Sequence, residues 1–321
     1  MVHSVNLHES PDVFVELIQA AAAHHAIPEV YVEKDYWVTK ALKRLSESDF
    51  ANQIVFKGGT SLSKAHRLIR RFSEDIDLAA KCCGVSGNKT KALLKHAEQA
   101  MTVDLDYQQN HARESKGTKF RKTVHAYPTA VEGGEFGVVS DAIFLELNAF
   151  TVPEPSEPLP ISSLIEDLLT AESRADLIAD HGLGAFEIEV LRVERTVCEK
   201  VMGLVRASYE DDPDAALRRQ IRHIYDLCMI LREPTYRDFL AADDFVQMMA
   251  IVRAADRSLF EGAERWLEKP ARDAVLLAEP DAIWSSLKTE FQGDFRQMLY
   301  DDELPDDAEV LEMLVSLRDR V

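Results

Sequence analysis

A short apolar strand that ends in two glycines is the feature that most constrains the fold. The run Gln53-Ile54-Val55-Phe56 has the length and character of a buried strand, and Gly58-Gly59 interrupts it. Thr60 can cap a helix that runs through Ile69, and a second strand is predicted over residues 72–79. A helix of about 11 residues spans about 16 Å, close to the length of a five-residue strand. The chain can therefore leave the first strand at the glycine pair and re-enter the same sheet.

Helices and strands also alternate in the rest of the first half. Two helices are predicted in the first 50 residues, the second over residues 29–46, and a third over 91–101 after a loop at 82–90. Strands are predicted over residues 119–127 and 143–150. This alternation predicts an α/β unit.

Four prolines in the segment VPEPSEPLP, residues 152–160, interrupt this pattern. Proline at that density cannot continue a helix or a central strand, so a linker or a long turn is predicted. The sequence beyond is almost entirely helical, except that residues 186–190 alternate like a strand and can return to the first sheet. We therefore expect an α+β (α/β) fold with two domains, residues 1–155 and a mainly helical part at 156–321. The helices predicted there cover residues 162–180, 194–208, 215–232, 243–266, 280–299 and 306–320.

The distribution of charge suggests one local anionic ligand. The chain has 321 residues and a formal net charge of −19, which makes it a poor general binder of nucleic acid. From Lys57 to Lys122, however, 14 Lys and Arg residues stand against 7 Asp and Glu residues, a local charge of +7. A solvated charged face is the alternative interpretation of this basic segment.

Two aspartates, Asp75 and Asp77, alternate with apolar residues in the second predicted strand. Because side chains on a strand alternate between its faces, the two carboxylates share one face, and Ile76 and Leu78 point to the core. Adjacent carboxylates repel unless a cation lies between them or one is protonated. Their oxygens suit Mg²⁺ or Mn²⁺. The alternative is a pair of solvated carboxylates on an exposed strand, although aspartate is disfavoured in strands.

The glycine pair has the properties of a phosphate-binding turn. Two glycines let a ligand approach the backbone closely, and the N-terminus of the following helix directs N–H groups and partial positive charge toward it. Thr60 and Ser61 add hydroxyl donors. The spacing of a Walker loop is absent, and a plain tight turn with a helix cap is the alternative. A phosphate-binding turn beside a pair of metal ligands would suit a nucleoside triphosphate with its metals.

Together these segments resemble a known family. GGTSL at residues 58–62, followed by R-x-S-x-D-I-D at 71–77, is similar to motif I of the AbiEii/AbiGii-type nucleotidyltransferase toxins, a group that includes the MenT toxins. Two further stretches resemble the family, VEKDYWV at residues 32–38 and RHIYDL at 222–227. The resemblance implies the DNA polymerase β-like nucleotidyltransferase superfamily, with a mixed-sheet core followed by a helical C-terminal domain.

The family pattern assigns roles to individual residues. It implies that Asp75 and Asp77 ligate the catalytic metals. A third carboxylate is expected on a neighbouring strand, where Glu146 is our candidate and a structural ion pair is the alternative. The family also has a helical lysine followed by a helical aspartate, which Lys200 and Asp226 match; a solvent-directed lysine and an ion pair within one helix are the alternatives. The residues implied to hold the triphosphate or to lie near the nucleotide are Lys57, Gly58, Gly59, Thr60, Ser61, Arg71, Ser73 and Lys200.

The resemblance implies a metal-dependent transfer of a nucleoside monophosphate from an NTP. The cofactor would be Mg²⁺, or Mn²⁺ in its place, and relatives suggest an RNA acceptor, in particular the 3′ end of tRNA. The family also implies a toxin with a cognate antitoxin, which in some relatives acts at the serine that corresponds to Ser73. In the basic segment, we expect the RNA backbone to be contacted by Lys116, Lys119, Arg121 and Lys122.

Three other functions stay open at this point. The same site could transfer the nucleotide to a protein hydroxyl, or the chain could bind nucleotide or antitoxin without catalysis. A phosphatase that uses D-x-D as its nucleophile is less favoured, because such enzymes have D-x-D-x-T and Ala79 stands at the threonine position.

Other sequence features place the chain in a reducing, aqueous compartment. No run approaches the roughly 20 apolar residues of a membrane span, and the first residues lack the pattern of a secretory signal. The four cysteines, Cys82, Cys83, Cys198 and Cys228, fit neither a zinc cluster nor a disulfide framework. We therefore expect a cytoplasmic protein.

Overall fold

The computed structural model describes residues 5–73, 75–82, 86–131, 140–300 and 303–321. Contacts between Cα atoms divide the chain into two compact units, which we describe separately. The first contains residues 1–66 and 72–191, and the second contains residues 67–71 and 192–321. Cys83 and residue 74 of the predicted second strand lie outside the described residues.

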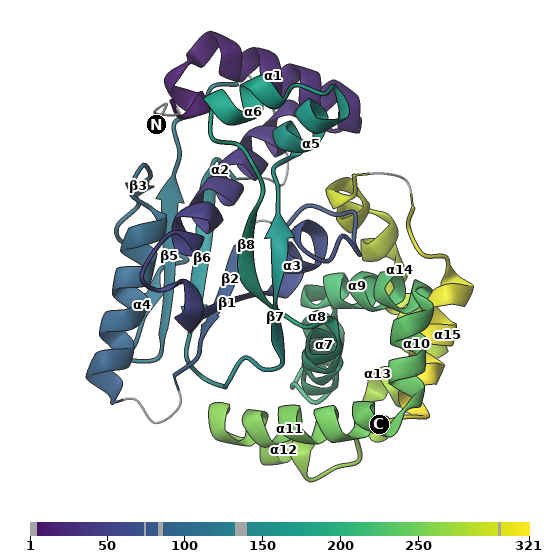
Figure 1. Ribbon diagram of the computed structural model, residues 1–321. Helices are drawn as coiled ribbons and strands as arrows, with labels where there is room; N and C mark the ends of the chain where they lie inside the picture. The colour runs from purple at the N-terminus through teal and green to yellow at the C-terminus, as the bar shows by residue number, and fades with distance from the viewer. Residues whose placement is uncertain (1–4, 74, 83–85, 132–139, 301–302) are drawn as a thin grey trace. The chain divides into compact units, whose positions relative to one another are not determined.

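An eight-stranded mixed sheet forms the centre of the first unit (Figure 1). Its strand order is β3-β5-β6-β2-β1-β8-β7, and β4 pairs with β5. Strands β1 and β2 are antiparallel, whereas β1–β8 and β2–β6 are parallel pairs. The strands are β1 (Ile54–Lys57), β2 (Asp75–Ala80), β3 (Asp106–Tyr107), β4 (Ser115–Lys116), β5 (Phe120–Ala126), β6 (Ala142–Asn148), β7 (Ser156–Ile161) and β8 (Phe186–Leu191).

The predicted connection from strand to helix to strand is present, but its helix is shorter than expected. Helix α3 (Gly58–Lys64) starts at the glycine pair and ends before Ile69. Arg67 has a φ of 54°, a left-handed conformation that a right-handed helix cannot contain. Strand β2 also starts later than predicted, at Asp75, because the chain before it pairs elsewhere: Arg71 forms a β-bridge with Leu299 in the second unit.

Residues 156–160 of the proline-rich segment lie in an edge strand, so our prediction of a linker or long turn was wrong for this part. Strand β7 pairs with β8 and stands at the end of the strand order. Pro158 and Pro160 lie two residues apart, so their nitrogens, which have no hydrogen to donate, face the same side of the strand. An edge strand tolerates this arrangement when that side faces away from its neighbour.

Two helices cover one face of this sheet. Helix α2 (Glu29–Ser46) has the predicted bounds and packs on β6 and β8, while α4 (Gly87–Met101) packs beside it on β5 and β6 (Figure 1). Helices α1 (Pro11–His25) and α5 (Leu164–Ala171) pack on α2, and α6 (Ala175–Asp180) follows α5. The core between helices and sheet is apolar, with Trp37, Leu42 and Leu145 at most 1% exposed. Short 3₁₀ helices are η1 (Leu7–Glu9) and η2 (Ala51–Gln53).

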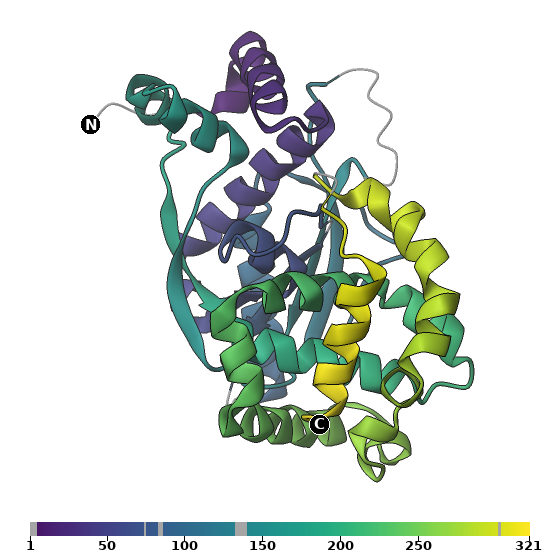
Figure 2. The same cartoon turned by 90° about the vertical axis from the view of Figure 1, so that its right-hand side faces the viewer.

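The second unit is helical, as predicted. The stripe Val197, Val201 and Leu204 on α7 is buried against α8, α9 and α11, and α15, yellow in Figure 2, packs against α9, α13 and α14. The helices are α7 (Val193–Ala207), α8 (Pro213–Arg219), α9 (Ile221–Arg232), α10 (Pro234–Ala241), α11 (Asp243–Leu259), α12 (Glu264–Leu267), α13 (Val275–Ala278), α14 (Pro280–Gln292) and α15 (Asp307–Arg318), with 3₁₀ helices η3 (Ala271–Asp273) and η4 (Asp294–Met298).

The first unit ends at Leu191, later than the boundary that we expected near residue 155. Strands β7 and β8 form an antiparallel pair that extends the sheet of the first unit, so residues 156–191 belong to it. The predicted return of residues 186–190 to the first sheet is therefore present. None of the helices in the described ranges is both long and apolar enough to cross a lipid bilayer.

Candidate active site

Asp75 and Asp77 lie on the same face of β2, as the sequence predicts. Both side chains are half-buried, whereas Ile76 and Leu78 between and after them are fully buried in the core. The pleat of the strand thus holds the two carboxylates side by side at the start of β2. This pair is the acidic centre of the candidate site.

Gly58 lies directly against Asp77. Lys57 pairs with Asp77 in the antiparallel register of β1 and β2, so α3 begins beside that carboxylate. Gly58 has a φ of 75°, and a Cβ atom at this position would overlap the Asp77 carboxylate. The turn therefore requires glycine at position 58 for two reasons: the positive φ and the close approach of the Asp77 carboxylate.

The hydroxyl groups of Thr60 and Ser61 support this turn from inside. Thr60 Oγ1 donates to the carbonyl oxygen of Asp75, and Ser61 Oγ donates to the carbonyl oxygen of Gly58 at 2.9 Å. Both residues are buried. We expected these hydroxyls as donors to a phosphate and Thr60 as the helix cap; in the structure they bond the main chain, and the residue before the helix is Lys57.

Glu146 is the third carboxylate on this part of the sheet. It stands opposite Asp77 in the parallel register of β2 and β6, as Phe144 stands opposite Asp75. Lys122 on β5 donates to Glu146 Oε1 over 2.6 Å. Both side chains are partly exposed, 48% and 31%.

A loop arginine approaches the other end of the acidic pair. Arg113 donates from Nη2 to Asp75 Oδ1 over 3.0 Å, and its guanidinium carbon lies 3.7 Å from the centre of the Phe144 ring. Arg113 and Lys122 thus bring positive charge to two of the three carboxylates. Repulsion between the carboxylates explains why cationic side chains gather here.

The donor set fits a hard divalent cation. Asp75 and Asp77 offer carboxylate oxygens on one face, and oxygen ligands are what Mg²⁺ and Mn²⁺ prefer. Among the described residues, no group of three or more Asp, Glu, His or Cys side chains forms a ready metal site. Mg²⁺ commonly uses one or two carboxylates and completes its shell with substrate phosphates and water. The two aspartates are sufficient for that mode of binding.

A second acidic centre lies within the helical unit. Asp226 on α9 is fully buried and accepts from Arg71 Nε and Nη2, at 2.6 and 2.7 Å, and from Lys200 Nζ on α7, at 2.6 Å. Burial alone would raise the pKa of Asp226, but the two cations lower it well below its ordinary value. The structure thus brings together three residues that the sequence analysis chose separately.

A match to a protein family covers most of the chain. The model of the family described as nucleotidyl transferase AbiEii toxin, type IV toxin–antitoxin system, matches residues 40–313. The chain belongs to the AbiEii nucleotidyltransferase toxin family. It is thus a nucleotidyltransferase, the toxin of a type IV toxin–antitoxin system, with an NTP substrate and an antitoxin partner. The match includes residues 240–313, for which we named no motif.

One solved structure resembles this AbiEii-family chain at low identity. It is MenT4, a nucleotidyltransferase toxin from Mycobacterium tuberculosis H37Rv, at 18% identity and a TM-score of 0.45. The similarity covers 94% of this chain and 99% of MenT4. A search of curated proteins gives no significant match. The assignment therefore depends on the family match, which confirms the resemblance seen in the sequence.

Some members of the predicted AbiEii site are placed differently from our expectation. A strand that began at residue 72, as the sequence predicts, would put Ser73 on the face of Asp75 and Asp77. In the structure Ser73 is half-buried but precedes the first residue of β2, so strand alternation does not put it there. Arg71, which we expected to hold the triphosphate or lie near the nucleotide, binds the carboxylate of Asp226. Arg121 is buried and paired with Glu98, so it does not offer the surface contact for RNA that we expected.

Arg113 was missed by sequence reasoning. It stands 38 residues after Asp75 in a polar loop, and no local pattern distinguishes it from its basic neighbours. The only available signal was its position in the basic segment between Lys57 and Lys122.

Proposed function

We propose that this toxin transfers a nucleoside monophosphate from an NTP to RNA, with the 3′ end of tRNA as the acceptor. The observation that carries the proposal is the position of Asp75 and Asp77 on one face of β2, with the backbone of Gly58 against Asp77. Binding of an NTP with its two metal ions requires carboxylate ligands for the metals next to a backbone turn that the phosphates can approach.

Asp75 and Asp77 would hold divalent cations, Mg²⁺ or Mn²⁺, and Glu146 would add a third carboxylate. Bound there, the cations would lower the pKa of the acceptor hydroxyl and neutralise charge on the leaving pyrophosphate. In the reaction, the acceptor oxygen forms a bond to the α-phosphorus of the NTP. The bond from that phosphorus to the bridging oxygen of the β-phosphate breaks, pyrophosphate leaves, and the hydroxyl proton passes to water.

The chain's own groups would bind and orient the triphosphate. The turn at Lys57, Gly58 and Gly59 allows close approach of the backbone, and Thr60 and Ser61 keep its shape through their bonds to main-chain carbonyls. Arg113 and Lys122 carry positive charge on the same face and could exchange their carboxylate partners for phosphate oxygens.

Lys200, Asp226 and Arg71 are proposed as further members of this machinery because the family pattern includes their positions. The buried ion pairs that Asp226 makes would fix the orientation of both cations. Only three residues of the chain separate Arg71 from Asp75. In our proposal the ammonium group of Lys200, held by Asp226, neutralises phosphate charge.

Ser73 is proposed as the position at which the cognate antitoxin controls the enzyme. It lies two residues before Asp75. A phosphoryl group there would add nearly two negative charges beside the metal ligands. Ser73→Asp should therefore lower transfer, and Ser73→Ala should not; full activity of Ser73→Asp would contradict this role.

The acceptor is tested by labelling. Each of the four NTPs, labelled at the α-phosphorus, is incubated with the toxin, Mg²⁺ and either purified tRNA or total cellular protein. The proposal predicts labelled tRNA and release of pyrophosphate. Labelled protein without labelled RNA would favour a protein hydroxyl as acceptor, and nucleotide binding without pyrophosphate release would favour a binding protein.

A further inference from the structure

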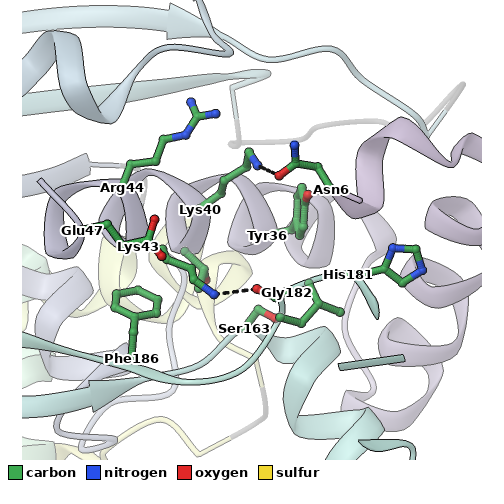
Figure 3. Close-up of a pocket in the computed structure, with 12 residues that line it drawn as sticks. Asn6, Tyr36, Lys40, Lys43, Arg44, Glu47, Ser163, His181, Gly182 and Phe186 are labelled. Carbon is green, nitrogen blue, oxygen red and sulfur yellow. Dashed lines mark hydrogen bonds between the residues drawn. The ribbon is translucent and has the colours of Figure 1, made fainter. Parts of the chain in front are cut away.

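A cavity of about 230 Å³ lies between α2 and the segment that joins α6 to β8 (Figure 3). Tyr36, Lys40 and Lys43 line it from α2, at spacings of four and three residues that place them on one face of a helix. Phe186 and His181 line it from the opposite segment. All of these residues belong to the first unit.

This cavity is separate from the acidic pair. Strand β8 runs parallel to β1, and Val190 on β8 is opposite Phe56 on β1. Phe186 precedes Val190 by four residues, which is about 13 Å along the strand. The acidic pair lies at the other end of β1, where Lys57 is opposite Asp77. Two ligands could therefore occupy the two positions without touching.

Positive charge is concentrated around the cavity. Among the described residues that line it, Lys40, Lys43 and Arg44 are cations and Glu47 is an acid. Asp104, outside the lining, pairs with Arg44 and lies 3.6 Å from Lys40. Like charges three and four residues apart on a helix repel each other. An anion in the cavity would relieve this repulsion.

The ionisation of Lys40 reflects this crowding. Burial, followed by the charge of Arg44, lowers the pKa of Lys40 to about 8. Its ammonium group donates to Asn6 Oδ1 at 2.5 Å, and Lys43 donates to the carbonyl oxygen of Gly182 at 2.6 Å, as Figure 3 shows. These contacts hold both ammonium groups at the wall of the cavity.

The remaining wall suits a ring. Phe186 and Leu183 contribute apolar surface, and Tyr36 lines the opposite side. Burial raises the pKa of Tyr36 to about 12, so its ring stays uncharged at neutral pH. A pocket of this size, with cations along α2 and the rings of Tyr36 and Phe186 on facing walls, suits a small amphipathic anion better than a polymer.

We propose that this cavity binds a small phosphorylated molecule that carries a planar ring, with its phosphate between Lys40 and Lys43 and its ring against Phe186. The site is an accessory one, distinct from the acidic pair that the proposed function uses. A nucleoside monophosphate has the required chemistry, and AMP is the probe.

Binding is measured by calorimetry on the full-length chain that carries Asp75→Ala, in EDTA, so that no nucleotide can bind through a metal. AMP should bind with a stoichiometry of one, and adenosine should bind much more weakly. Lys40→Met and Lys43→Met should each lower the affinity for AMP on the order of tenfold, since each removes a charge-assisted contact. Phe186→Leu should lower the affinity for AMP but not the affinity for inorganic phosphate. Lys95→Met, at an exposed position on α4, is the matched control and should bind as the parent does.

Three results would overturn the proposal. AMP binding no tighter than adenosine binding would exclude a phosphate site. Unchanged affinity in both Lys40→Met and Lys43→Met would place any bound nucleotide elsewhere. A short single-stranded RNA that binds through Lys40 when AMP does not would show a polymer site instead. Because the experiment contains no metal and no intact acidic pair, its outcome is independent of the proposed transfer reaction.

Discussion

The backbone of Gly58 lies against the carboxylate of Asp77, with no room for a side chain between them. The antiparallel register of β1 and β2 creates this contact, because it places Lys57 opposite Asp77 and so starts α3 beside the acidic pair. Strand pairing thus brings a glycine turn to two carboxylates that stand about 16 residues later in the sequence.

Gly58→Ala should inactivate the enzyme. The new methyl group would meet the Asp77 carboxylate, and the φ of 75° is strained for alanine. A displacement of a reacting group by about 1 Å can lower a rate on the order of 100-fold, and we expect a loss of that size. Gly184→Ala is the matched control, because its Cβ would be 3.8 Å from the nearest side-chain atom. Transfer by Gly58→Ala at the rate of Gly184→Ala would show that the contact is unimportant.

Asp226→Asn should strongly destabilise the chain. It leaves the buried cations of Arg71 and Lys200 without their carboxylate, a change that costs about 3–5 kcal/mol of unfolding free energy. Asp176→Asn, which removes an exposed partner of Arg174, should change the free energy of unfolding far less. Urea unfolding measures both. Because the pKa of Asp226 is lowered by folding, its contribution is present above the ordinary value of 3.8 and is lost as the pH falls below it.

Arg113→Ala should increase the affinity of the acidic pair for a metal ion. The guanidinium group pairs with Asp75 and its positive charge opposes a second cation there. Partly exposed pairs are worth about 0.2–1 kcal/mol, so the dissociation constant for Mn²⁺ without nucleotide should fall by a factor between about 1.4 and 5. Spin-resonance titration of free Mn²⁺ measures this, with Arg174→Ala as the control. Weaker Mn²⁺ binding by Arg113→Ala would contradict the competition between arginine and metal.

His8 should make stability depend on pH in the mildly acidic range. Burial, followed by the charge of Lys40, lowers the pKa of His8 from 6.5 to about 4. The unfolded chain therefore takes up a proton first as the pH falls, and the free energy of unfolding should decrease between about pH 6.5 and pH 4. His8→Gln should make this decrease shallower, and His24→Gln, at an exposed position, should not. Equal slopes for His8→Gln and the unchanged chain would refute the effect.

The strands and the acidic pair could be predicted because their signals are local. The apolar run at 54–56, the glycine pair and the alternation around Asp77 lie within 25 residues, and each pattern can be recognised from adjacent residues alone. Contacts between distant segments could not be predicted in this way. Arg71 and Asp226 are 155 residues apart, and nothing near either residue specifies the other.

The predictions that were wrong depended on backbone conformations and distant contacts that composition does not determine. The prolines of β7 indicated a linker, but their spacing of two residues suits an edge strand, whose position at the edge only the completed sheet reveals. The helix predicted through Ile69 ends early because Arg67 is left-handed, a conformation that arginine seldom adopts. We predicted Arg121 to be an exposed cation, but its position in the sheet pairs it with Glu98.

The most direct measurement of the central claim compares Asp75→Ala with the unchanged enzyme in the transfer of labelled nucleotide to tRNA. The account predicts that labelling disappears in Asp75→Ala, while the circular dichroism spectrum and the cooperative unfolding transition are retained. Labelling by a folded Asp75→Ala variant at the rate of the unchanged enzyme would contradict it.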